Sequence, residues 1–145
     1  MADFIELEDL WRDSERKMPS GKVVAVLSGK LPERGLELIR PFSRALLTGE
    51  IHELIVTDEE RAGPLQTVNR IAYVCFFEII TGGIMLVGDE LSIGDARIGT
   101  IAGFDETHMP NHLNIVAKSD QRRSGKNRGI RLEDTVLIRE IKIKE

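Results

Sequence analysis

A chain of 145 residues with a formal net charge of -4 is long enough to form one domain, and it offers no bulk attraction to nucleic acid or anionic lipid. Its content of 41% hydrophobic and 30% charged residues is typical of an ordinary globular protein and excludes a disordered or membrane-embedded chain. We therefore predict a single domain over residues 1–145.

The N-terminal segment is predicted to form an amphipathic helix over residues 3–17, as an extension of the main domain. Phe4, Leu7 and Trp11 recur at roughly helical spacing among charged residues. The segment is acidic where a signal peptide would be basic, and no apolar run approaches the roughly eighteen residues that span a membrane. The only cysteine, Cys75, lies among apolar residues and has no disulfide partner, which favours a cytoplasmic location.

The rest of the chain has the pattern of short strands. Apolar and β-branched runs are separated by Gly, Asp, Asn and Pro at intervals of about eight to twelve residues, a spacing typical of sandwiches and barrels. The predicted strands are 22–27, 51–57, 70–80, 84–87, 90–93, 97–102, 113–118 and 135–143. Residues 35–39 fit a strand or a helix, and Pro41 suits the start of a short helix that ends before Gly49.

In the last predicted strand the apolar phase changes from Val136 and Ile138 to Ile141 and Ile143, which indicates a β-bulge. Bulges help small barrels to close. We therefore predict an all-β fold, a small closed or partly open β-barrel with an N-terminal amphipathic helix and one further short helix as an open alternative.

The richest local concentration of metal ligands and acid–base groups comprises Asp105, Glu106, His108 and His112. Imidazoles and carboxylates suit a divalent metal, for which His108 and His112 are the candidate ligands, and histidines also titrate near neutral pH. Because Pro110 disfavours a helix between the two histidines, their rings need not converge. A loop in which a histidine caps a strand end is the preferred interpretation.

Glu78 is a further candidate for a ligand or acid–base group. A carboxylate within the apolar run FFEII must be paired, protonated or turned toward a cavity. An ion pair with Arg70 or Arg97 would satisfy it, and so would a ligand. His52 is the third histidine, and its glutamate neighbours favour an exposed strand position.

The polar stretch Ser119–Gly129 contains a basic run of Arg122, Arg123, Lys126 and Arg128. No aromatic residue interrupts this run to stack on a base, so a solvated hairpin tip is favoured over a nucleic-acid site. The sequence has no phosphate-binding loop, dinucleotide fingerprint, nucleophile elbow or CxxC pair.

Several segments resemble a known family: LIVTDEERAGP, GDELSIGD, RIGTIAGF, NHLNIV and GIRLEDTVLIRE. They are similar to parts of the enzyme IIA component of the glucitol/sorbitol phosphotransferase system, a small barrel-like cytoplasmic protein. The resemblance implies a barrel fold. That family carries phosphate on a histidine just before the region that matches Gly82, and the corresponding position here falls near Phe76, with Glu78 two residues on. Neither residue can form a phosphohistidine, so the family's reaction is not implied.

Three functions fit these observations. The preferred hypothesis is a non-catalytic cytoplasmic β-barrel without a cofactor that binds a small ligand or a protein partner, with a homo-oligomer left open. The second is an enzyme that uses His108, His112 and a nearby acid, with or without a divalent metal. The third is a phosphocarrier in which another histidine has taken over the phosphate-accepting role.

Overall fold

A computed structural model describes residues 14–141, and every regular element in this range is a β-strand. The all-β prediction is therefore confirmed for the described part of the chain. Most of the predicted helix over residues 3–17 lies outside the described residues, and residues 14–17 have no helical backbone. Among the described residues, no helix is long and apolar enough to cross a membrane.

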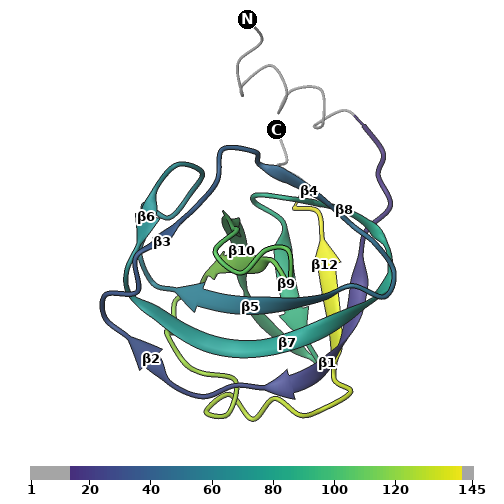
Figure 1. Cartoon of the computed structure of the whole chain (residues 1–145). Helices are drawn as coiled ribbons and strands as arrows, with labels where there is room; N and C mark the ends of the chain where they lie inside the picture. Colours follow the sequence, from purple (N-terminus) through teal and green to yellow (C-terminus); the bar gives the residue numbers. More distant parts are fainter. Residues whose placement is uncertain (1–13, 142–145) are drawn as a thin grey trace, which may run out of the picture.

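The main sheet closes on itself as a ring of strands (Figure 1). It has 8 strands in the order β1-β12-β9-β10-β11-β5-β7-β2, and an additional pairing of β1 with β7 completes the ring. Strands β11 and β5 are parallel, while the other paired neighbours are antiparallel. The bounds are β1 Ser20–Val26, β2 Lys30–Leu31, β5 Ile51–Thr57, β7 Ile71–Thr81, β9 Glu90–Ile93, β10 Ala96–Asp105, β11 Asn114–Lys118 and β12 Thr135–Arg139.

Two small two-stranded sheets flank the ring. β3 (Leu36–Glu37) pairs with β6 (Thr67–Val68), and β4 (Ser43–Leu46) pairs with β8 (Gly83–Leu86). The short helix predicted after Pro41 is wrong, because this segment is β4. Its residues form an antiparallel ladder with β8, and that pairing overrides the local helical signal.

Of the predicted strand 135–143, residues 142 and 143 lie outside the described residues, and within the described part the strand is shorter than predicted. Strand β12 ends at Arg139, which lies opposite Glu90, the first residue of its neighbour β9. The ladder stops where the partner strand begins, so the predicted bulge after Ile138 is absent from β12. Register shifts occur instead in the pairs β1–β7, β9–β10, β10–β11 and β5–β7.

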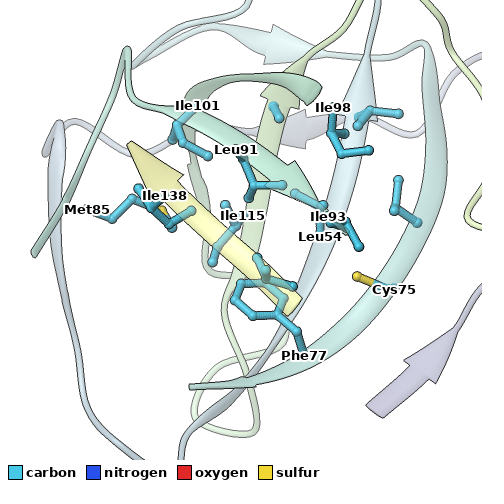
Figure 2. Packing of buried hydrophobic residues seen from close by; sticks show 14 of the residues in the cluster. Leu54, Cys75, Phe77, Met85, Leu91, Ile93, Ile98, Ile101, Ile115 and Ile138 are labelled. Atoms are coloured by element: carbon cyan, nitrogen blue, oxygen red, sulfur yellow. The ribbon is translucent and has the colours of Figure 1, made fainter. Parts of the chain in front are cut away.

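Apolar side chains from the strands fill the interior of the ring (Figure 2). Leu54, Phe77, Leu91 and Ile115 come from four different strands and are fully or almost fully buried. A second cluster covers the opposite face of the sheet, because side chains alternate along a strand: Ile55, next to Leu54, belongs to this second cluster together with residues of β3 and β6. The two-stranded sheet of β3 and β6 thus covers part of the outer face of the ring.

Candidate functional site

A row of polar side chains crosses the outer face of the ring. Asp105 in β10 lies opposite Asn114 in β11, Asn114 lies beside Glu53 in β5, and Glu53 lies opposite Phe76 in β7. Each of them is next in sequence to a residue of the inner cluster, so all four point outward. Asp105, Asn114 and Glu53 are nonetheless buried, at 2%, 0% and 6% exposure.

Asp105 accepts hydrogen bonds from three segments. Its carboxylate binds the Glu37 backbone N–H at 3.1 Å, the Thr107 N–H at 2.9 Å and the Asn114 Nδ2 at 3.1 Å. Burial alone would raise the pKa of Asp105, but these hydrogen bonds hold it below its ordinary value. Asp105 therefore acts as an anchor that joins β3, β11 and the following turn.

Asn114 is oriented by this contact. Its Nδ2 must face the carboxylate of Asp105, because only the amide nitrogen can donate. The side-chain oxygen Oδ1 is buried and has no hydrogen-bond partner in the described part of the chain. An unsatisfied buried acceptor lowers the free energy of unfolding by about 1 to 3 kcal/mol, so this oxygen destabilises the fold.

Glu53 also contacts His112, which lies in the turn just before β11. The Glu53 Oε1 lies 3.2 Å from the His112 Nε2, and both side chains are largely buried. Burial raises the pKa of Glu53, and the hydrogen bond and charge of His112 only partly oppose this effect. The pair therefore joins a buried carboxyl group to an imidazole near the surface.

The turn between β10 and β11 brings two of the predicted histidines together. The ring centroids of His108 and His112 are 5.1 Å apart with an interplanar angle of 33°. His112 also contacts Phe76 edge-on, with centroids 4.9 Å apart, and its Nδ1 lies 3.1 Å from the Asn111 Oδ1. His108 is exposed and the His112 side chain is 14% exposed, so the pair joins the surface to the buried row.

His52 is buried at 3% exposure, which corrects the prediction of an exposed position. Strand β5 is buried along almost its whole length, because the inner core covers one face and the second cluster and the polar row cover the other. The His52 Nδ1 accepts the Leu113 N–H at 3.0 Å, so the Nε2 carries the proton and donates to Glu50 at 3.2 Å. The sequence predicted that a histidine of the 105–112 region caps a strand end. In the structure it is His52 that caps the start of β11, through the Leu113 N–H.

Because His52 is buried, the free energy of unfolding should depend on pH. Burial lowers the pKa of His52 below its ordinary value of 6.5, although Glu50 partly opposes this. The unfolded chain therefore binds this proton more readily, so the stabilisation is complete above about pH 6.5 and is lost as the pH falls below it.

The variant His52→Asn keeps an acceptor for the Leu113 N–H but cannot titrate. In urea unfolding between pH 7.5 and 5, we expect the wild type to lose more stability than this variant. Identical pH profiles would contradict the assignment.

Glu78 and Glu106 lie apart from the buried row. Glu78 in β7 stands opposite Lys22 in β1, and the predicted partners are engaged elsewhere: Arg70 pairs with Asp58, and Arg97 pairs with Glu90. These expected ion pairs of Glu78 are therefore wrong. Glu106 is exposed and lies 3.8 Å from Arg44.

The described residues contain no group of three or more His, Cys, Asp or Glu side chains arranged to hold a metal ion. His108 and His112 are close, but the His112 Nε2 is directed to Glu53 and its Nδ1 to Asn111. A metal at this pair would have to displace one of these contacts.

Cys75 is buried in the inner core, and burial raises the pKa of its thiol to about 12. We expect the native protein to react with a thiol reagent at pH 8 about a thousandfold more slowly than a free cysteine, since the thiolate is the reactive form. Labelling with a chromogenic disulfide reagent, before and after unfolding in guanidinium, measures this. Rapid labelling of the folded protein would contradict the core assignment.

A model of DUF6917, a family of unknown function, matches residues 13–139. The chain belongs to this family. No match was found among curated proteins or among solved structures. In this DUF6917 protein the match includes every strand of the ring and the whole candidate site.

Two residues of the DUF6917 site are absent from the sequence prediction. Glu53 stands only as a neighbour of His52 in the strand pattern, and Asn114 has no local feature that indicates burial. Glu53 and His112 are 59 positions apart in the chain, and the parallel pairing of β5 with β11 brings them together. The only available sequence signal is a charged residue within the apolar strand IHELIV.

Proposed function

We propose that this protein is a non-catalytic cytoplasmic binding module, built as a small β-barrel, that holds a small polar ligand at the His108–His112 pair. The barrel description is supported by the closed ring and its interior filled with apolar side chains, which leaves binding to the outer surface. The cytoplasmic location is supported by the single, buried and unpaired Cys75.

The observation that carries the proposal is the engagement of both ring nitrogens of His112, by Glu53 at 3.2 Å and by Asn111 at 3.1 Å. An imidazole held in this way is fixed in orientation beside the exposed ring of His108, whereas a general base needs a nitrogen free to take a proton. Behind it, Glu53 and the unpaired Asn114 oxygen are buried at a cost in stability. The other buried side-chain atom without a partner among the described residues is the Nε of Arg16, whose guanidinium pairs with Asp89. A destabilising buried polar group directly behind an exposed histidine pair is typical of a functional surface.

Ligand screening by nuclear magnetic resonance tests the proposal. A set of sugars, amino acids, short dicarboxylic acids and nucleosides is added to the labelled protein, and the backbone amides of the turn, residues 105–114, are followed. We expect saturable shifts in this turn that are lost in His112→Gln and kept in Lys126→Gln, a control on the far loop. Shifts confined to other regions, or no saturable shift at all, would overturn it.

A histidine-dependent or metal-dependent enzyme is a second candidate, because Glu53 with its raised pKa and His112 form a carboxyl–imidazole pair. Calorimetric titration with Zn²⁺ tests the metal-dependent form. Binding that disappears in both His108→Ala and His112→Ala would favour it, and equal heats in wild type and variants would remove it. Conversion of a screening hit into product would likewise favour an enzyme.

A divergent phosphocarrier is a third candidate, supported by the contact of His112 with Phe76. In the resemblance to the glucitol/sorbitol enzyme IIA, the phosphate-accepting position falls near Phe76, so His112 lies where a replacement histidine would be needed. Incubation with phosphoenolpyruvate, enzyme I and the general phosphocarrier protein, followed by mass spectrometry, tests this. An acid-labile phosphate on His112 would support it, and unmodified histidines would exclude it.

Self-association is part of the proposal as one form of partner binding. Leu47, Ile51 and Ile80 are exposed at 65%, 45% and 47%, and the Gly49 N–H binds the Ile79 carbonyl, so the turn that holds Leu47 lies at the end of β7. Light scattering after size exclusion measures the mass. A dimer that dissociates in Ile80→Lys would support a homo-oligomer at this patch, and a monomeric wild type would exclude it.

A further inference from the structure

A groove of about 480 Å³ lies at the far end of β11 from His112. It runs between the β9–β10 turn and the loop that connects β11 to β12, which is drawn yellow-green at the lower edge of Figure 1. Its polar lining includes Asp95, Arg97, Gln121, Arg123, Arg128 and Asp134. Because β11 and β12 are not neighbours in the sheet, this loop is not the hairpin tip predicted from its polar sequence.

Hydrogen bonds from two arginines shape the loop. Arg128 donates to the Ser119 hydroxyl at 3.1 Å, to the Arg123 carbonyl at 2.9 Å and to the Gln121 carbonyl. Arg123 donates to the Gln121 side-chain oxygen at 3.4 Å and to the Asn127 carbonyl. All of these acceptors are uncharged, so the contacts fix the positions of both guanidinium groups without neutralising them.

Three other arginines near this end of the ring have carboxylate partners. Arg97 pairs with Glu90, while Arg70 and Arg122 both reach Asp58. Within the described part of the chain, no carboxylate lies within 4.0 Å of the guanidinium groups of Arg123 or Arg128.

Two carboxylates also line the groove, but neither forms an ion pair with Arg123 or Arg128. Asp134 accepts the Arg131 N–H at 2.9 Å, and Asp95 is exposed at the turn. Burial lowers the pKa of Arg128, and the charge of Arg123 adds to the effect. Arg128 is half-buried and Arg123 is exposed, so two like charges are held near one another beside an open groove.

We propose that this groove binds the phosphate group of a small molecule through Arg123 and Arg128. A guanidinium presents up to five N–H donors in a planar fork that matches a tetrahedral oxyanion, and Arg128 uses its Nε and Nη2 for the loop, which leaves its Nη1 for a ligand. An anion would relieve the repulsion between the two cations. The arginine groove contains neither His108 nor His112, so a test of phosphate binding there is independent of the proposed function.

The test uses inorganic phosphate, glucose 6-phosphate and sodium chloride at matched ionic strength, each titrated into the labelled full-length protein. Amide shifts of Gly94 and Gly129, which line the groove, report binding. We expect both phosphates to give saturable shifts that chloride does not give, with affinity reduced about tenfold or more in Arg123→Gln and in Arg128→Gln, since charge-assisted hydrogen bonds are lost. Arg70→Gln, which removes an exposed paired arginine, is the matched control and should bind like the wild type.

Arg128 also supports the loop, so Arg128→Lys serves as a second variant that keeps the charge and loses the fork. If Arg128→Gln disturbs the loop, the Arg123→Gln variant decides the result. Tighter binding of glucose 6-phosphate than of inorganic phosphate would identify a phosphate ester as the ligand, and the reverse would identify the free anion. Wild-type affinity in a folded Arg123→Gln variant, or no saturable shift with either phosphate, would overturn the proposal.

Discussion

Replacing Gly125 by alanine is expected to destabilise the protein by about 3 kcal/mol, at the upper end of the cost of overpacking a filled site. A Cβ at this position would lie 1.9 Å from the Val74 carbonyl oxygen and 3.2 Å from that of Leu27. Both oxygens already accept hydrogen bonds, because the Leu27 N–H binds the Val74 carbonyl and the Lys126 N–H binds the Leu27 carbonyl. Neither oxygen can move without disturbing one of these two hydrogen bonds.

Urea unfolding measures this change, and Gly63→Ala is the matched control. The nearest atom to a Cβ at Gly63 is the Arg61 carbonyl oxygen at 3.8 Å, an ordinary contact. We expect the control to change stability by no more than about 0.5 kcal/mol. Equal stabilities of the two variants would show that the close approach at Gly125 relaxes at little cost. Because Gly125 anchors the loop that carries Arg123 and Arg128, the proposed phosphate binding should weaken along with stability.

Removing Arg16 is expected to cost about 3 to 5 kcal/mol, the range for breaking a buried ion pair on one side. Arg16 Nη1 donates to Asp89 Oδ2 and to the Ile84 carbonyl, both at 2.8 Å, and its Nη2 contacts Asp89 Oδ1. The two side chains are only 2% and 4% exposed. In Arg16→Met the carboxylate of Asp89 would keep the Leu86 N–H at 2.8 Å and would lose its only ion-pair partner among the described residues.

The measurement is a double-mutant cycle in urea with Arg16→Met, Asp89→Asn and the combined variant. We expect the double variant to be far less destabilised than the sum of the single variants, since each single variant leaves one buried charge unpaired and the double variant leaves none. The exposed pair Arg97–Glu90 provides the control, and Arg97→Met should cost no more than about 1 kcal/mol. Additive effects at Arg16 and Asp89, or equal losses in Arg16→Met and Arg97→Met, would contradict a buried and coupled pair.

Local patterns were sufficient for most of the strands. The predicted strands 51–57 and 90–93 agree with β5 and β9 in both bounds, and the prediction 70–80 differs from β7 by one residue at each end. Their alternating or continuous apolar runs depend on burial that the sequence itself encodes. The helix predicted at Pro41 failed because β4 depends on its pairing with β8, a segment about forty positions away for which no local window carries a signal.

The candidate site was predicted only in its local part. Asp105, His108 and His112 lie within eight positions of one another, so their clustering is visible in the sequence. The residues that contact them are distant in the sequence and cannot be recognised from it. Glu53 reaches His112 only because β5 and β11 pair in parallel, and the same pairing buries His52 and gives its Nδ1 a backbone donor.

The sequence by itself determined the all-β class and the positions of most strands, because strand periodicity and turn residues act over a few positions. It also indicated the turn that carries the two histidines. Only the tertiary structure decided that the strands close into a ring, that a buried carboxyl and amide row backs His112, and that Arg123 and Arg128 hold a loop beside a groove. These features depend on strand register and on close backbone approach at residues such as Gly125, and both bring together segments that are distant in the chain.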